Sequence, residues 1–494
     1  MALGGAKISV IISFVIYSIV LLGIAEYSRR RMKNSKIDDY MDDFYTGGRG
    51  MGSFVIVFML AAGLCSAGTF LGSPGLAYKV GLIFPLAVMA QSFMNFVVLG
   101  QVGTKVGIVA RRVNAQSFQD ILSARYNNNK ILRWATAISI LVFYTANVVA
   151  QLSGGSRLIQ VMTGLPYVTA LLIFGIVVLI YTTTGGIKGV STAIVFQGAI
   201  MTAAIVVLFI TLLTKVAPMQ EAYKTIVAQD PNLVSPWVWT PAYTFSMFVA
   251  LGLVTIGQPH GLMTSLMYKD TKGMHKAMFI GAVVVAAWSA MIVWSGNLGR
   301  AIVPTLDVPD YIIPFLAVQM MPGWVAGLVL AGVAAAIQSS VAAVIIVISS
   351  ALVRDMYLQV KPTTDNKKLQ KITMYATIIA AGIPLLLAIS PPQALQWLIM
   401  FAIGGLTSTF FWPLLLGLYW WRTTEQGALV GMIGGMVTFI LVQGKFIPWN
   451  FGMHGIVMGI LVSGILTIGV SLITPKPPKS VIEIFWGKTK SLAE

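Results

Sequence analysis

The sequence predicts an all-α protein that crosses a membrane many times. Of its 494 residues, 57% are hydrophobic and only 10% are charged, whereas about a quarter of the residues in an average soluble domain are charged. Many separate windows of about 20 apolar residues are each long enough to cross a bilayer. Two windows, five apart, are interrupted by Gly and Pro, which indicates two related halves. We therefore predict about 13 transmembrane helices around a core of two inverted five-helix repeats.

The predicted spans cover most of the chain. They lie at residues 8–28, 52–77, 81–103, 132–156, 164–184, 190–214, 240–262, 277–299, 323–353, 372–390, 395–420, 427–443 and 455–473. We accordingly divide the chain into an extra N-terminal helix (1–30), a first repeat (52–215), a second repeat (240–421), two peripheral helices (422–475) and a tail (476–494).

The basic residues indicate how the chain is oriented in the membrane. Although the formal net charge of +17 would suit a nucleic-acid partner, the 33 Lys and Arg residues alternate between loops. One side receives only Lys7, Lys79, Arg157, Lys215, Lys224, Arg300 and Lys445. The positive-inside rule makes the other side cytoplasmic. We predict a plasma (inner) membrane protein with its N-terminus outside and its C-terminus cytoplasmic, and no nucleic-acid partner.

Several chemistries are disfavoured by what the chain contains. The first span is followed by basic residues and lacks a small-residue cleavage site, so it reads as a retained helix. A lone cysteine, Cys65, excludes internal disulfides, and His260, His275 and His454 form no metal-ligand pattern. We find no phosphate-binding loop, so we expect no ATP-driven step and no enzyme activity.

The two interrupted spans point to a binding site at mid-membrane. The second span reads AAGLCSAGTFLGSPGLAY (61–78) and the seventh reads ALGLVTIGQPHGLM (250–263). Either one alone is typical of a packing kink. As a pair in corresponding positions they indicate discontinuous helices that open two repeats, which is where transporters bind substrate and coupling ion.

Several motifs carry a family resemblance. DDFYTGGRGMG (42–52), GSPGLAYKVGL (72–82), YTTTGGIKGV (181–190), AAAIQSS (334–340) and FAIGGLTSTFFWPLLLGLYW (401–420) resemble, in order, the sodium:solute symporter family. ARRVNAQSFQDILSARY (110–126) and LGRAIVPTLDVPDYIIP (298–314) are similar to its sodium/pantothenate subgroup. The resemblance implies a leucine-transporter-like fold and sodium-coupled uptake by alternating access.

The serine pair in AAAIQSS suggests a cation site. Ala336, Ser339 and Ser340 stand at i, i+3 and i+4, so they share one helix face and bring three oxygens together. The resemblance adds the backbone carbonyls of Ala62 and Cys65, which completes a predicted sodium site. The alternative is that the hydroxyls only bond the preceding turn or a neighbouring helix.

Four positions depart from the family pattern. Ile194 stands where the family carries an Asp that contributes to a second sodium site, which favours one sodium ion per cycle. Thr264 replaces an Arg, and Thr407 replaces the Glu of the pantothenate type. Gln338 occupies a position that is usually apolar, and its amide could face the cavity or bond a neighbouring helix.

Polar residues within the core spans are candidates for the substrate pocket. They are Ser66, Thr69, Gln91, Asn95, Asn147, Gln151, Thr255, Gln258 and Gln338. We expect about half of them to make only interhelical hydrogen bonds. The set is rich in amides and free of carboxylates, so it suits a small polar, possibly anionic solute. Tyr144 and Trp412 are candidate gate residues, although aromatic residues in such helices more often only pack.

Sodium-coupled import of a small organic anion is the function that the sequence favours. The predicted partners are pantothenate or a related solute, Na⁺ as coupling ion and the lipid bilayer. Another carboxylate or an amino acid such as proline is the alternative substrate. A passive channel would need a continuous polar lining, and a membrane sensor would need a signalling domain. The sequence leaves the oligomeric state open.

Overall fold

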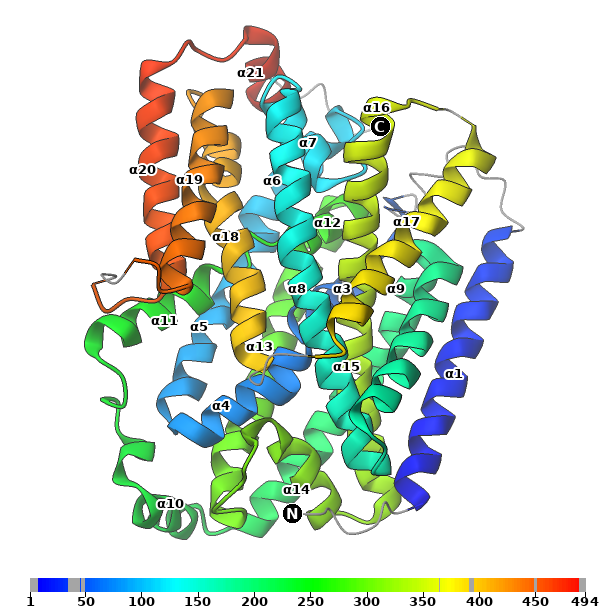
Figure 1. Ribbon diagram of the computed structural model, residues 1–494, viewed down its shortest axis with the longest axis vertical. Coiled ribbons are helices and arrows are strands. Elements are labelled where there is room, and N and C mark those ends of the chain that lie inside the picture. The colour runs from blue at the N-terminus through cyan, green and yellow to red at the C-terminus, as the bar shows by residue number, and fades with distance from the viewer. Residues whose placement is uncertain are drawn as a thin grey trace.

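The computed structural model describes residues 8–33, 45, 49–363, 365–390, 395–447 and 451–487, except for some side chains within helices. This part of the chain is a bundle of helices (Figure 1), with an isolated bridge between Met51 and Tyr268. Eight described helices are long and apolar enough to cross a membrane. Three shorter apolar stretches, Ile8–Ile24, Tyr167–Ile180 and Pro241–Leu253, accompany them. The predicted helical membrane class is confirmed, while the number of thirteen crossings stays a prediction.

The helices follow the predicted order. They are α1 (Ile8–Lys33), α3 (Ser53–Leu64), η2 (Gly68–Gly72), α4 (Ser73–Val80), α5 (Ile83–Val97), η3 (Val98–Gly103), α6 (Thr104–Arg112), α7 (Phe118–Arg125), α8 (Lys130–Thr163), α9 (Tyr167–Val216), α10 (Met219–Gln229), η4 (Pro231–Val234), α11 (Pro241–Leu253), α12 (Pro259–Met267), α13 (Thr271–Ile302), η5 (Pro309–Tyr311), α14 (Ile312–Met320), α15 (Gly323–Ser350), η6 (Ala351–Tyr357), α16 (Leu358–Val360), α17 (Asn366–Leu387), α18 (Leu395–Tyr419), α19 (Glu425–Gln443), α20 (Gly455–Ile473) and α21 (Lys479–Trp486).

The bundle has two ends, between which the long helices run. Figure 1 shows α7, α16 and α21 at one end, here called the α21 end, and α10 and α14 at the other, the α14 end. Helix α1 lies at one edge of this view, and α19 and α20 lie at the opposite edge.

Helix α15 forms the centre of the bundle. Its side chains from Val329 to Ala342 are all buried, including Gln338, Ser339 and Ser340. It packs against α1, α8, α9 and α17. A helix that is apolar around its whole circumference must be enclosed by other helices, and this position explains why three buried polar side chains there need partners inside the protein.

Both predicted helix interruptions are present, and the two broken helices run in opposite directions. At the start of α3, the Met51 N–H donates to the carbonyl of Met267, the last residue of α12, at 3.0 Å. Past the end of α4, the Leu82 N–H donates at 2.8 Å to the carbonyl of Leu233 in η4, the element that precedes α11. The beginning of one broken helix therefore lies beside the end of the other, as an inverted repeat requires. The boundaries 52–215 and 240–421 remain predictions.

A glycine makes the second of these contacts possible. Gly81 ends α4 with φ +82°, and a Cβ there would lie 1.9 Å from the carbonyl oxygen of Leu233. Only glycine combines this backbone conformation with so close an approach.

The spans predicted at 164–184 and 190–214 fall in one helical element, α9, where we had expected two helices separated near Lys188. Both ends of α9 lie at the α14 end: the Tyr167 hydroxyl donates to the Ala388 carbonyl at 2.7 Å, and α10 follows Val216 (Figure 1). The element must therefore reverse direction between its two apolar stretches.

A buried arginine holds α7 against the end of α18. Arg125 is 2% exposed. Its Nε donates to the Gly417 carbonyl at 2.6 Å, and its Nη2 donates to the Thr423 carbonyl at 2.9 Å and the Trp420 carbonyl at 3.2 Å. The last carbonyls of a helix lack partners within the helix and carry partial negative charge, so a buried guanidinium is stabilised there.

We predict that Arg125→Ala destabilises the protein by about 3 kcal/mol, because several buried carbonyls lose a charged donor. Thermal unfolding in detergent would measure this as a lower melting temperature. Arg125→Lys should recover only part of the loss, since an ammonium cannot reproduce the planar fork of donors. A melting temperature equal to that of the unmodified protein would contradict the assignment.

Candidate ion and substrate site

The break in α3 lies against Ser340 of α15. Cys65 ends α3 in an extended conformation, with φ −95° and ψ 102°. The Ser340 hydroxyl donates to the Cys65 carbonyl at 3.0 Å, and both residues are buried. The break therefore turns a backbone carbonyl toward α15, and the Cys65 thiol plays no part in this contact.

Ser339 contributes a second hydroxyl beside Ser340. Its Oγ donates to the Ala336 carbonyl at 3.0 Å, one turn earlier in α15. In each of these two pairs, the hydroxyl oxygen lies 3.0 Å from the carbonyl oxygen. This is about the separation of neighbouring oxygen ligands around a small cation. The same hydrogen bonds also satisfy the hydroxyls when no ion is bound. Ala62 lies in the last turns of α3, and its side chain is outside the described residues.

A small cavity of about 70 Å³ lies beside these oxygens. Ser340 contributes to its wall, and among the described residues that line it none is a carboxylate, Lys or Arg. The candidates brought together around the cavity are Ser66, Thr69, Gln91, Asn147, Gln151, Thr255 and Gln258. The structure describes Asn95 in α5 without its side chain.

The polar side chains of the cavity also support the two breaks. The Ala67 N–H, just past the break in α3, donates to Gln151 Oε1 of α8 at 2.7 Å. At the other break, the Thr407 hydroxyl contacts the Val254 carbonyl at 3.1 Å. Gln258 Nε2 donates to the Ile403 carbonyl at 3.0 Å. Unwound backbone at membrane depth needs such internal partners.

His260 is a site residue that sequence reasoning missed. It lines the cavity just past the break between α11 and α12, and its Nδ1 lies 2.7 Å from the Tyr144 hydroxyl of α8. The His260 backbone N–H also donates to that hydroxyl, at 3.0 Å. These two contacts hold Tyr144 of α8 against the break between α11 and α12. The signal in the sequence was a histidine within the interrupted motif GQPHGLM, which we had considered only as a possible metal ligand.

Gln338 lies outside the cavity lining. The Tyr17 hydroxyl of α1 donates to Gln338 Oε1 at 2.8 Å, and Gln197 Nε2 of α9 donates to the Tyr17 oxygen at 3.2 Å. Of the two alternatives left open by the sequence, the geometry favours the bond to a neighbouring helix. Ile194, at the position of the family Asp, is buried in the hydrophobic core.

Thr264 and Trp412 also contact other parts of the protein. The Thr264 hydroxyl donates to the Gly261 carbonyl within α12 at 2.6 Å. Trp412 packs on α20, where a Cβ on Gly464 would lie 2.6 Å from the indole nitrogen. Trp412 therefore packs against a neighbouring helix, which favours packing over the gate role.

A larger hollow of about 610 Å³ lies at the α14 end. It shares Gln396 and Met400 of α18 with the small cavity, so these two side chains separate the hollows. Arg157 and Asp310 form an ion pair of 2.8 Å in its wall. Burial raises the pKa of Asp310, an effect that Arg157 opposes. Burial also lowers the pKa of His454, another wall residue, to about 4, so this imidazole stays neutral at physiological pH.

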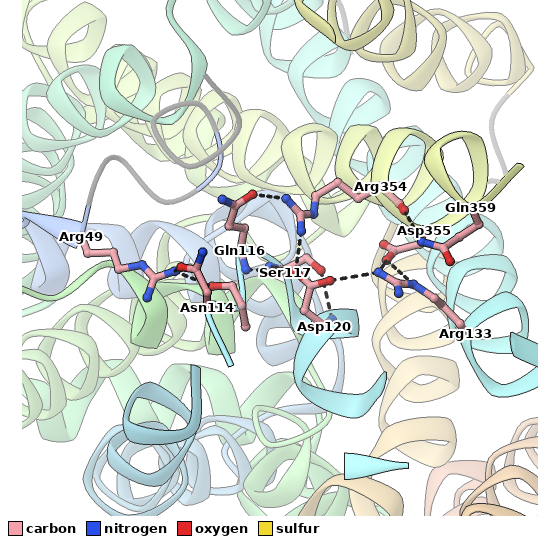
Figure 2. A network of polar contacts seen from close by, with 10 residues as sticks. Arg49, Asn114, Gln116, Ser117, Asp120, Arg133, Arg354, Asp355 and Gln359 are labelled. Atoms are coloured by element: carbon pink, nitrogen blue, oxygen red, sulfur yellow. Dashed lines mark hydrogen bonds and ion pairs between the residues drawn. The ribbon is translucent and has the colours of Figure 1, made fainter. Parts of the chain in front are cut away.

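A network of charged side chains lies at the α21 end (Figure 2). Asp120 accepts from Arg354 Nη2 at 2.9 Å through Oδ2 and from Arg133 Nη2 at 3.0 Å through Oδ1. The buried Asp355 accepts from Arg133 at 3.2 Å, and Arg354 also bonds Gln116. The network joins α7, α8 and η6 through charge-assisted hydrogen bonds.

Comparisons with known proteins identify the family. The model of the sodium:solute symporter family matches residues 44–435. The chain belongs to the sodium:solute symporter family. It is therefore a sodium-coupled secondary transporter in a membrane and not an enzyme.

Individual relatives cover nearly the whole chain. A sodium/pantothenate symporter from Escherichia coli is 36% identical over 92% of this chain and 95% of its own length. One from Haemophilus influenzae is 33% identical over 91% of this chain and 93% of its own. The osmoregulated proline transporter OpuE from Bacillus subtilis is 29% identical over 97% of this chain and 98% of its own.

Solved structures agree on the fold. A Na⁺-coupled sialic acid symporter superposes with a TM-score of 0.80 and 21% identity, over 95% of this chain and 98% of its own. The predicted leucine-transporter-like fold with its inverted-repeat core is confirmed.

We predict that Gly257→Ala strongly impairs the protein, because a Cβ there would lie 2.5 Å from the backbone Cα of Thr407. The break between α11 and α12 would be pushed away from α18. Sodium-driven uptake and thermal stability should both fall. Gly261→Ala is the matched control: four residues further on, its Cβ would meet nothing within 4 Å, and Ala favours a helix by about 0.5–1 kcal/mol. Equal behaviour of the two variants would contradict the close approach.

Proposed function

We propose that the protein imports pantothenate, or a related small organic anion, together with sodium. The observation that carries this proposal is the cavity beside Ser340, whose described lining offers amides and hydroxyls and no carboxylate. Pantothenate carries a carboxylate, an amide and hydroxyls, and such a lining matches these groups without repelling the negative charge. The sodium/pantothenate symporters among the relatives support the same substrate.

The sodium ion would bind between the break in α3 and the centre of α15. Its ligands would be the carbonyl oxygens of Ala62, Cys65 and Ala336 and the hydroxyl oxygens of Ser339 and Ser340. The two hydrogen bonds of 3.0 Å support this site, because rotation of each O–H away from its carbonyl leaves both oxygens free to face the ion. Binding would tie α3 to α15 and so shape the adjacent substrate cavity.

Transport would proceed by alternating access between the two ends. The α21 end would be cytoplasmic by the positive-inside rule, because four arginines gather there: Arg112, Arg125, Arg133 and Arg354. The hollow at the α14 end would then be the outer vestibule of a plasma (inner) membrane protein. The cavity of about 70 Å³ holds roughly two water molecules, so a solute the size of pantothenate requires that Gln396 and Met400 move apart.

Another carboxylate, or an amino acid such as proline, is the alternative substrate. Thr264 stands where pantothenate and proline symporters carry Arg, and Thr407 stands where the pantothenate type carries Glu. A proline transporter is among the relatives. Both threonines are buried and bonded to backbone.

Uptake into proteoliposomes tests the proposed substrate. Labelled pantothenate should accumulate under an inward sodium gradient and not under potassium, and unlabelled pantothenate should compete better than proline. Sodium-dependent accumulation of proline without that of pantothenate would replace the substrate and leave the class intact.

We predict that Ser340→Ala and Ser339→Ala each raise the sodium concentration for half-maximal uptake by about tenfold, since each removes one oxygen ligand. The measurement is initial uptake against sodium concentration. Ser139→Ala serves as control, because this hydroxyl bonds only the preceding turn of α8 and Met436. An unchanged sodium dependence in both site variants would remove the serine pair from the ion site.

We predict that Asp120→Asn opens the α21 end, because Arg133 and Arg354 lose a shared anionic partner. Cys65, which is 1% exposed, reports this directly as the single cysteine of the chain. Its alkylation by a maleimide added at that end should be about tenfold faster than in the unmodified protein. Glu483→Gln, which removes an exposed charge on α21, should leave the rate unchanged. Equal rates in the two variants would show that the network does not close this end.

A further inference from the structure

A third hollow, of about 500 Å³, lies at the α21 end. It shares no lining residue with the small cavity beside Ser340 or with the hollow at the α14 end. Its walls come from α6, α7, α8, η6 and α21. The volume falls within the range of about 300–1,000 Å³ that is typical of small-molecule sites.

The lining of this hollow is basic and rich in donors. Arg112, Arg133 and Arg354 contribute three positive charges from three different helices, and Asp120 is the one acidic side chain among the described lining residues. The remaining lining residues include two serines and three asparagines, namely Ser123, Ser480, Asn114, Asn127 and Asn128. By contrast, the small cavity beside Ser340 has no Lys or Arg in its described lining.

Two residues that line the hollow also carry a buried donor without a partner in the described part of the chain. The Ser123 hydroxyl is buried without a hydrogen bond, in a residue that is only 2% exposed. Arg354 Nε is likewise buried and unbonded. Both atoms are buried behind the wall of the hollow, so a bound anion would meet the exposed donors of the lining and not these two.

We propose that this hollow binds a phosphate-bearing anion. Converging guanidinium groups with hydroxyl and amide donors around them are the arrangement that recognises phosphate oxygens. A phosphate monoester carries about two negative charges near neutral pH and a phosphodiester carries one. The three arginines of the lining outnumber the aspartates that pair with them, Asp120 and Asp355. The phosphate is that of a soluble small molecule or of a lipid headgroup.

Occupancy would favour closure of the α21 end. Arg112 belongs to α6, Arg133 to α8 and Arg354 to η6, and the last two also bond Asp120 of α7. An anion that contacts all three arginines links the elements that must separate to open this end. Helix α21 covers one side, because Arg112 Nη1 donates to the Ile484 carbonyl at 2.6 Å. Binding at this site therefore couples the level of a phosphorylated ligand to transport.

Calorimetric titration of the purified full-length protein with inorganic pyrophosphate tests the proposal. The protein in a neutral detergent should bind pyrophosphate saturably at one site. Arg112→Gln should weaken binding by about tenfold, since one charged donor is lost. Ser480→Asp places a negative charge in the exposed wall formed by α21 and should weaken binding at least as much.

Controls separate this site from general attraction of anions. Lys371→Gln removes an exposed positive charge on α17, outside the hollow, and should bind pyrophosphate like the unmodified protein. Arg112→Gln should retain sodium-driven uptake in the absence of pyrophosphate, which shows that it is folded. Absence of saturable binding, or equal binding by all three variants, would overturn the proposal.

A second arm distinguishes the two sources of phosphate. The protein is reconstituted in vesicles of phosphatidylcholine alone or with phosphatidylglycerol, and pyrophosphate binding is measured in each. A headgroup ligand predicts that phosphatidylglycerol weakens pyrophosphate binding in the unmodified protein and has no such effect in Arg112→Gln. A soluble ligand predicts the same affinity in both vesicles.

Discussion

Backbone groups that are freed where α3 and α11 unwind must find partners inside the protein, and this constraint organises the whole site. At membrane depth no bulk water replaces the lost helical hydrogen bonds. The Cys65 carbonyl therefore meets Ser340, the Ala67 N–H meets Gln151, and the Val254 carbonyl meets Thr407. Each partner comes from a different unbroken helix, so the breaks are held in register with α15, α8 and α18.

The same constraint explains why the site lies between the two halves. The broken helices run in opposite directions, which brings both breaks to the middle of the bundle. There a small cavity is surrounded by neutral polar groups, while the charged networks lie at the ends. Ion pairs join α7, α8 and η6 at the α21 end. At the α14 end, Gln396 and Met400 lie between the larger hollow and the small cavity.

The amino-acid sequence predicts those features that local composition determines. Gly and Pro mark both breaks, apolar length marks the spans, and the Ser339–Ser340 pair with the family resemblance points to the ion site. Contacts between distant segments were not predictable in this way. Tyr144 meets His260 across 116 positions, and no local pattern joins them. Gln338 is adjacent to Ser339, yet a rotation of about 100° per residue directs it to Tyr17 instead of the cavity. Arg133 and Arg354 contributed to the sequence analysis only through the count of basic residues. Their ion pairs with Asp120 and Asp355 were not predicted, because the network forms only when three helices meet.

Equilibrium binding of radioactive sodium to the purified protein without substrate tests the central claim most directly. The account predicts saturable binding of one ion per chain, with its affinity reduced about tenfold or more in Ser340→Ala, because the Ser340 hydroxyl and the Cys65 carbonyl bind the same ion. Ser139→Ala should bind sodium like the unmodified protein. Unchanged binding in Ser340→Ala would contradict the account, and the Ser340–Cys65 contact would then be only a hydrogen bond that supports the break.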